Sequence, residues 1–240
     1  MTASLRDVKI YKTYPHKCSY LEDREATTLF VDPAQTVDKT LYSSLSGIGF
    51  RRSGSHIYRP HCGACSDCIP ARIPVSRFTP SRAQRRVKNR NQDITVEESF
   101  DITDDGAYEL YAEYITLRHA DGDMYPPSRD QYESFLNNPW DCTRYYRFYA
   151  PSQNDEKQLL AIAVADFLED GQSAIYTFFD PHQAKRSLGT YTLLWQVENA
   201  RKLELDYLYL GYWIRDCQKM AYKVDYRPLE LRVNNHWAAI

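Results

Sequence analysis

The residues best suited to chemistry lie in one turn of the chain. An apolar, aromatic run over 174–179 predicts a buried strand, Asp180 and Pro181 end it, and a helical segment begins near Arg186. A strand that passes through a polar turn into a helix presents backbone N–H groups and the positive end of the helix dipole to an anion. Arg186 adds a full positive charge there, with Ser187 and Gly189 beside it. The turn therefore predicts a binding site for a phosphate or a carboxylate.

Four cysteines form a second group of reactive side chains. Cys62, Cys65 and Cys68 follow the pattern C-x2-C-x2-C, and this spacing lets three thiolates converge on one metal ion or cluster. Cys18 is available as a fourth ligand from far away in the sequence. The pattern predicts a structural zinc ion or an iron–sulfur cluster, and the alternative is a turn whose thiols pack or stay free.

Three carboxylates and a phenol supply the candidate catalytic groups. Asp121 and Asp123 lie in the loop after a predicted helix, and Tyr212 lies near the end of the last long strand. Together with Asp180, these are the side chains that we expect to hold or transfer a proton. Each has a structural alternative, because Asp-Gly-Asp before Pro-Pro is typical of a turn and a tyrosine in a strand is typical of a core.

Positive charge is concentrated in one window of a chain whose formal net charge is −2. Residues 51–90 carry ten Arg or Lys against one acidic residue, Asp67, which gives this window a net charge of +9. Most of the ten are arginines, which bind phosphate through two hydrogen bonds and stack on bases. A helix predicted over 79–91, with Thr79 as its cap, places four of them on one face: Arg82, Arg85, Arg86 and Arg90. We expect this face to bind an RNA backbone.

The sequence predicts a cytoplasmic protein with reduced thiols. The N-terminus lacks the apolar segment of a signal peptide, and no stretch approaches the ~18 consecutive apolar residues of a membrane span. Six cysteines without such a signal favour a reducing compartment. Neither a membrane nor DNA is expected as a partner.

The predicted elements indicate an α+β fold with two domains. Residues 1–95 form a smaller mixed α/β part that carries the cysteine cluster and the basic helix. Residues 96–240 follow the order helix, helix, three antiparallel strands, helix and strand, which is typical of a GNAT-like acyltransferase domain. A boundary near residue 95 fits the change to an acidic, extended sequence. The candidate residues of the second domain then lie at the ends of its central strands.

Several sequence blocks resemble one family over nearly the whole chain. The blocks are, in order, GFRRSG, YRPHCGACSDCIPARIPVSRFTPSRAQRR, RHADGDMYPPS, AIYTFFDP, RSLGTYTLLWQVE and YLYLGYWIRDCQKMAYKVDYRPLEL. On these blocks the chain resembles the bacterial aminoacyl-tRNA–protein transferases, relatives of the eukaryotic arginyltransferases. The resemblance implies transfer of leucine from leucyl-tRNA to the α-amino group of proteins that begin with Asp or Glu, which directs those proteins to N-degron degradation.

The implied reaction gives roles to particular residues. An aminoacyl ester is already activated, so the chemistry requires neither a cofactor nor a covalent nucleophile. The tRNA 3′ end is expected at Arg82, Arg85, Arg86, Arg186, Ser187 and Gly189. The acidic side chain of the acceptor requires a cation, for which the candidates are Arg118, Lys219 and Lys223. An apolar leucyl pocket is expected from Phe178, Phe179, Trp195 and Trp213. Arginyl-type relatives hold zinc or an iron–sulfur cluster, and the implied ligands here are Cys18, Cys62, Cys65 and Cys68.

Three other functions remain open at this level. Arginyl transfer to the same acceptors requires a buried carboxylate in the donor pocket, which the sequence alone does not locate. An acetyl-CoA-dependent N-acetyltransferase fits the order of elements but leaves the basic window unexplained. A non-enzymatic RNA-binding protein with a metal ion or cluster explains the cysteines and arginines but leaves the turn after Asp180 without a role.

Overall fold

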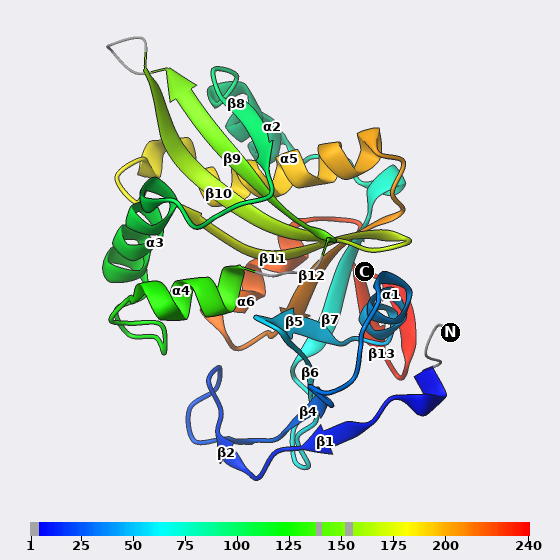
Figure 1. Ribbon diagram of the computed structural model, residues 1–240. Coiled ribbons are helices and arrows are strands. Elements are labelled where there is room, and N and C mark those ends of the chain that lie inside the picture. Colours follow the sequence, from blue (N-terminus) through cyan, green and yellow to red (C-terminus); the bar gives the residue numbers. More distant parts are fainter. Residues whose placement is uncertain (1–4, 138–140, 152–155) are drawn as a thin grey trace.

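An eight-stranded mixed sheet runs through the molecule in the order β14-β13-β7-β12-β11-β10-β9-β8 (Figure 1). The computed structural model describes residues 5–137, 141–151 and 156–240. The strands of this sheet are β7 (Ile69–Pro74), β8 (Thr95–Ser99), β9 (Thr143–Pro151), β10 (Lys157–Phe167), β11 (Gly171–Phe179), β12 (Tyr207–Trp213), β13 (Glu230–Val233) and β14 (His236–Ala239). The predicted turn that begins at Asp155 lies partly outside the described residues.

The neighbouring strands β11 and β12 diverge after a short parallel pairing. They pair only where residues 171–173 lie opposite residues 207–209, and every other strand pair that the structure describes in this sheet is antiparallel. The register of β12 against β7 shifts between Tyr209 and Gly211, and Gly211 has a φ of +75°. Such a bulge bends a strand and changes its direction. Beyond Ser173 the side of β11 that faced β12 is therefore open, and residues 174–177 are half-buried.

Helices cover both faces of the sheet because its central strand is apolar on both sides. In β10, Ile162 and Val164 pack with α3 (Asp105–Arg118) and α4 (Arg129–Leu136), whereas Ala161 and Ala163 pack with α5 (Leu188–Lys202). This alternation follows from the period of two along a strand. Figure 1 shows α3 and α4 in front of the sheet and α5 behind it. The turn between β11 and α5 therefore crosses one edge of the sheet from face to face.

A smaller sheet built from the N-terminal residues packs against the large one. Its order is β1-β4-β6-β5, and its strands are β1 (Ile10–Lys12), β4 (Thr28–Val31), β6 (His56–Pro60) and β5 (Arg51–Ser53). The hairpin of β2 (His16–Lys17) and β3 (Glu25–Ala26) and the helix α1 (Lys39–Gly47) accompany it. Arg52 of β5 forms a fully buried ion pair with Asp166 of β10 at 2.6 Å, which joins the two sheets.

Most predicted elements are present, and the basic helix begins later than expected. The helix α2 spans Arg82–Arg90, and Ser81 caps it through a reciprocal pair of hydrogen bonds with Gln84. The prediction of Thr79 as the cap was wrong, because a capping box needs Gln or Glu three residues after the cap. The mixed α and β content agrees with the predicted class. None of the described helices is both long and apolar enough to cross a bilayer.

The predicted division at residue 95 cuts through the large sheet. β7 belongs to the first 95 residues in sequence, but it lies between β12 and β13 in the sheet. α2 likewise packs on α5 through an ion pair between Lys88 and Glu198. Elements from both parts of the sequence therefore surround the opening between β11 and β12.

Candidate active site

Arg51 fills the point at which β11 and β12 diverge. Its guanidinium donates to Ser173 Oγ and to the carbonyl oxygen of Ala174, each at 2.5 Å. A Cβ on Gly211 would lie 3.2 Å from Arg51 Nε, so the glycine leaves the space that the guanidinium occupies. Arg51 is 9% exposed. A buried positive charge therefore sits at the base of the opening.

A second buried cation, Lys223, lies near Arg51. It follows α6 (Gln218–Ala221), is 3% exposed, and its Nζ contacts Met220 Sδ at 3.3 Å. Burial, and then the charge of Arg51, lower the pKa of Lys223 to about 7. Among the described residues, no carboxylate forms an ion pair with either cation. The predicted acceptor-binding role of Lys223 stays a prediction, and its position beside Arg51 agrees with that role.

The end of α3 brings a histidine and a tyrosine together beside this opening. His119 Nε2 lies 3.1 Å from the hydroxyl of Tyr114, and the two rings are in contact. Burial, and then the charge of Lys219, lower the pKa of His119 below its usual range. The imidazole is therefore neutral at neutral pH and can accept a proton.

Two predicted site residues are paired with each other on the surface. Lys219 Nζ lies 2.9 Å from both carboxylate oxygens of Asp121, and both side chains are largely exposed. Asp123 is exposed in the same loop. Arg118 is exposed at the end of α3, with its guanidinium 5.9 Å from the ring of Phe179. These four residues lie around the end of α3, as α6 and the loop after α3 come together there.

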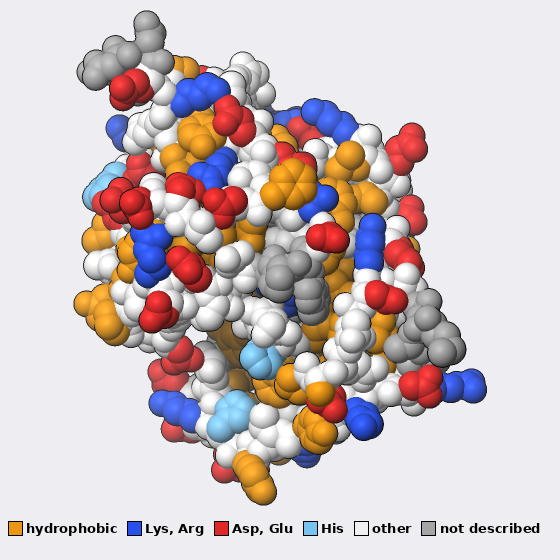
Figure 2. Space-filling view, in the orientation of Figure 1, with side chains coloured by type: hydrophobic (Ala, Val, Ile, Leu, Met, Phe, Trp, Pro, Cys, Tyr) orange, Lys and Arg blue, Asp and Glu red, His pale blue; other side chains and the backbone are white. Residues whose placement is uncertain are grey.

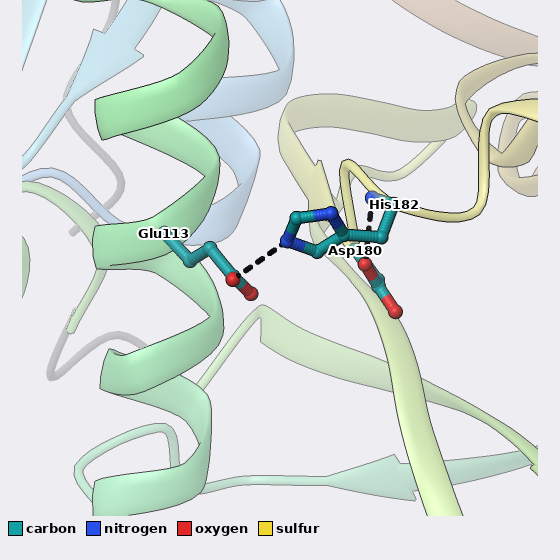
Figure 3. Close-up of side chains that lie close together, drawn as sticks. All are labelled: Glu113, Asp180 and His182. Atoms are coloured by element: carbon teal, nitrogen blue, oxygen red, sulfur yellow. Dashed lines mark hydrogen bonds and ion pairs between the residues drawn. The ribbon is translucent and has the colours of Figure 1, made fainter.

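At the far end of β11, Asp180 lies close to His182 and Glu113, and hydrogen bonds connect the three residues (Figure 3). Asp180 is buried, and its Oδ1 accepts a hydrogen bond from the backbone N–H of His182 at 2.8 Å. His182 Nε2 lies 3.0 Å from Glu113 Oε1 of α3. One ligand atom from each of the three lies within 4.8 Å of the others, a spacing that could hold a metal ion and that the hydrogen bonds also explain. The sequence analysis missed Glu113 and His182.

The turn before α5 has the predicted shape but a different charge. Ser187 begins the helix at a φ of +54°, and a Cβ on Gly189 would lie 3.1 Å from Phe179 Cε1. Glycine therefore lets the turn pack closely on Phe179. Arg186 forms two hydrogen bonds to Asp93, at 2.7 and 2.9 Å, and these lower the pKa of Asp93. Arg186 was expected to add a full positive charge at this turn, and in the structure Asp93 pairs with that charge.

The basic surface is smaller than the sequence indicated, and it adjoins this turn. Arg82, Arg85 and Arg86 of α2 are exposed, with no acidic partner among the residues that the structure describes. Asn91, just after α2, donates to the carbonyl oxygen of Arg186 at 2.8 Å. In contrast, three arginines of the +9 window are buried and face inward: Arg51, Arg52 and Arg72. The +9 charge of the window is therefore not all on one surface, because these three arginines bind polar groups inside the fold.

The four aromatic residues predicted for the leucyl pocket do not meet in one place. Phe178 packs under α3, Trp195 contacts Tyr146 and Phe148 on the α5 side, and Trp213 donates to the carbonyl oxygen of Ala221. Neighbouring residues of a strand point to opposite faces, which separates Phe178 from Phe179. Phe179 alone of the four borders the turn at Gly189 as well as Tyr114.

Tyr212 occupies a structural position. It is 2% exposed, and its hydroxyl donates to the carbonyl oxygen of Gly49 at 2.9 Å. Burial raises the pKa of Tyr212 well above its usual range. The expectation that it acts as an acid finds no support in this placement, because its proton is already used inside the core.

The four cysteines gather near one surface hollow. Cys62, Cys65 and Cys68 line it, and burial followed by the charges of Cys18, Cys62 and Cys65 raises the pKa of Cys68 to about 12. Four thiols suit zinc or an iron–sulfur cluster. Cys65 Sγ points at Asp67 Oδ2 at 3.2 Å, and no three described thiols lie within 4.8 Å of one another. Metal binding by these residues stays a prediction.

Solved structures with a similar fold share little sequence with this chain. L-PGS from Bacillus licheniformis has a TM-score of 0.51 and 11% identity, with 83% of this chain and 62% of that chain covered. FemX has a TM-score of 0.50 and 11% identity, with 86% of this chain and 81% of that chain covered. These similarities concern the fold alone.

Sequence comparisons are far more specific. Family models described as "Arginine-tRNA-protein transferase, N terminus" and "Arginine-tRNA-protein transferase, C terminus" match residues 16–86 and 106–233. A protein of Saccharophagus degradans named aspartate/glutamate leucyltransferase is 54% identical, with 97% of both chains covered. A protein of Pseudomonas putida with the same name is 50% identical, with 98% of both chains covered. Both halves of the sequence and nearly its full length thus lead to one conclusion: the chain belongs to the arginine-tRNA-protein transferase family.

Proposed function

We propose that this protein transfers leucine from leucyl-tRNA to the N-terminal α-amino group of proteins that begin with Asp or Glu. The observation that carries this proposal is the identity of 50–54%, over 97–98% of both chains, to relatives named aspartate/glutamate leucyltransferase. The reaction takes place in the cytoplasm, where charged tRNA is available, and it marks the acceptor protein for degradation.

The part of the chain that carries out the transfer is a GNAT-like acyltransferase domain. Support comes from the parallel strands β11 and β12, which pair over three residues and then diverge. The opening between them is lined by Arg51 and flanked by the end of α3 and by α6. An amine and an ester can meet there, because the acceptor enters from the open side and the donor from the turn before α5.

The donor tRNA lies against α2 and the turn before α5. Arg82, Arg85 and Arg86 are exposed and have no acidic partner among the described residues, so their charges are available to phosphates. Asn91 joins the end of α2 to the turn, which places Ser187 and Gly189 next to the basic surface. Phe179, packed on Gly189, forms the apolar wall for the leucyl side chain. Asp180 lies beside Phe179, and its carboxylate accepts hydrogen bonds from the hydroxyl groups of the terminal ribose.

In the transfer step, the acceptor nitrogen attacks the ester carbonyl. The C–N bond forms, the bond between the carbonyl carbon and the ribose oxygen breaks, and the proton lost by the amine ends on that ribose oxygen. His119 is the group that receives the proton from the amine, because its imidazole is neutral and Tyr114 holds it in place. A zinc ion or iron–sulfur cluster, held by Cys18, Cys62, Cys65 and Cys68, would stabilise the N-terminal part and take no part in this step.

A transfer assay with purified protein tests the proposed function. Charged Leu-tRNA and charged Arg-tRNA are each offered with peptides that begin with Asp, Glu, Lys or Arg. We expect leucine on the Asp and Glu peptides only. Preferential use of Arg-tRNA would establish arginyl transfer instead, and inactivity with every pair would reject both. Acetyl-CoA should neither replace the tRNA nor raise the thermal unfolding temperature.

A further inference from the structure

Arg51 and Lys223 are two buried cations whose contacts with the described residues are all neutral. Arg51 donates to a hydroxyl and a carbonyl oxygen, and Lys223 contacts a thioether and the ring of Tyr222. Their exposures are 9% and 3%. Proteins rarely bury Lys or Arg without a carboxylate, because the charge loses its hydration and gains no opposite charge in return. The pair therefore lacks the anion that its surroundings require.

Other buried arginines of this molecule have such a carboxylate. Arg52, the next residue along β5, pairs with Asp166 at 2.6 Å, and Arg72 pairs with Glu230 at 2.8 Å. The arrangement at Arg51 is thus local to the opening between β11 and β12. Both buried cations lie against β12: Arg51 packs on Gly211, and the turn Tyr222–Asp225, which holds Lys223, also contacts this strand.

The position of the pair favours a ligand that arrives from the acceptor side. Arg51 lies where β11 and β12 part, and Lys223 follows the chain between β12 and α6. Figure 2 shows the surface hollowed in this region, below α4, where Figure 1 places the chain between β12 and α6. His119 and Tyr114 lie on the same side, at the end of α3, which meets α6 through the contact of Asp121 with Lys219.

Because Arg51 and Lys223 are buried, only some kinds of anion can reach them. An RNA phosphate is part of a thick backbone, and the exposed arginines of α2 already offer it a surface. A carboxylate on one or two methylene groups is slim enough to reach cations that are less than one-tenth exposed. Two adjacent cations also match the two oxygens of a carboxylate.

We propose that Arg51 and Lys223 together form the subsite that binds the side-chain carboxylate of the acceptor's N-terminal Asp or Glu. The inference rests on the proposed function, and it adds to it the residues that select the acceptor. With the carboxylate held there, the α-amino group points to His119.

Paired acceptors that differ only in charge test this subsite. Initial rates of leucine transfer are measured for peptides that begin with Asp and for matched peptides that begin with Asn. In Lys223→Met we expect kcat/KM for the Asp peptide to fall by about 30-fold or more, because one member of a buried charge pair is lost. For the Asn peptide we expect a change below about threefold, as no charge is bound. Lys223→Arg, which keeps the charge, should retain the preference for Asp, and Arg51→Lys should weaken it less than Lys223→Met.

The control variant is Lys202→Met at the exposed end of α5, which should leave both rates unchanged. Equal losses for the Asp and Asn peptides in Lys223→Met would overturn the proposal. Binding of fluorescent Asp and Asn peptides, measured by anisotropy without tRNA, separates this outcome from failure of the proposed function. A Lys223-dependent preference for Asp in binding, with no leucine transfer, would reject the function and keep the subsite. Leucine transfer with an unchanged Asp preference in Lys223→Met would reject the subsite and keep the function.

Discussion

At the scale of single residues, Lys223 shows a conflict between stability and function. Among the described residues, its buried ammonium group has Met220 Sδ as its one hydrogen-bond partner, and Arg51 opposes its charge. In the free protein this arrangement is unfavourable, and a carboxylate bound in the proposed subsite would supply the opposite charge. Residues that destabilise a fold and are kept are characteristic of binding sites.

Replacement of Lys223 by Met should therefore stabilise the protein. The pKa of Lys223 is about 7 in the folded chain and about 10.4 in the unfolded chain. Below pH 7 both states are protonated and the penalty is complete; above about pH 10.5 both are neutral and it vanishes. We expect Lys223→Met to raise the free energy of unfolding by roughly 1–4 kcal/mol at pH 6. The gain should shrink as the pH rises from 7 to 10.

Urea unfolding of both proteins at pH 6, 7.5 and 9 measures this difference. The groups that act on Lys223 are Arg51, which lowers its pKa, and Cys217, which raises it. A variant that is less stable than the parent at pH 6 would show that the ammonium group has an internal partner.

The sequence identified several residues of the site but not their partners. Lys219 and Asp121 were both expected in the site, and their mutual contact depends on how α6 meets the loop after α3. Arg186 was expected to offer its charge to an anion, and its pairing with Asp93 joins two residues that lie far apart in sequence. From the sequence, Arg51 was recognised only as one of the ten positive charges of residues 51–90. Long-range pairing of this kind has no local signal, so it could not be predicted.

At the scale of elements, strong local sequence patterns were sufficient to predict helices. α5 begins at Leu188, close to the predicted start near Arg186, and it follows the turn that Asp180 and Pro181 begin. The divergence of β11 from β12 had no such signal, because it results from a bulge at Gly211 that makes room for Arg51. Strand order likewise depends on contacts between distant segments.

The basic helix α2 allows a prediction about salt. If Arg82, Arg85 and Arg86 bind phosphates, replacing all three by Gln should weaken tRNA binding and reduce the slope of log K against log salt. Each lost phosphate contact reduces the slope by about 0.7–0.9. Filter binding of leucyl-tRNA across a range of KCl concentrations measures the slope. The matched control replaces three exposed lysines of the N-terminal part, Lys9, Lys12 and Lys17, by Gln. An unchanged slope in the α2 variant would place the tRNA elsewhere.

At the scale of the whole molecule, the two parts of the sequence form one structure. β7 supplies a central strand of the large sheet, and the buried pair of Arg52 and Asp166 joins β5 to β10. Tyr42 also donates to Asp166, at 2.9 Å. Removing one partner of a buried ion pair costs about 3–5 kcal/mol. Separation of the parts would remove this pair and a whole strand together.

Residues 1–95 and 96–240, produced as separate chains, should therefore not fold independently. Without β7, β12 loses its antiparallel neighbour and the apolar surface under α5 is exposed. We expect each fragment to lack a cooperative thermal transition and near-ultraviolet circular dichroism. The full chain is the control. A fragment 96–240 with a cooperative transition near that of the full chain would show that the first part is an independent addition.

The place of β7 between β12 and β13 also affects how the protein is made. On the ribosome, Ile69–Pro74 is synthesised long before Tyr207–Trp213 and Glu230–Val233, its two neighbours in the sheet. At ~5–20 residues per second, the nascent chain carries an unpaired apolar strand for several seconds. A chain that stops between β12 and β13 keeps the pairing of β7 with β12 but leaves the other side of β7 unpaired, and such an exposed strand edge favours aggregation.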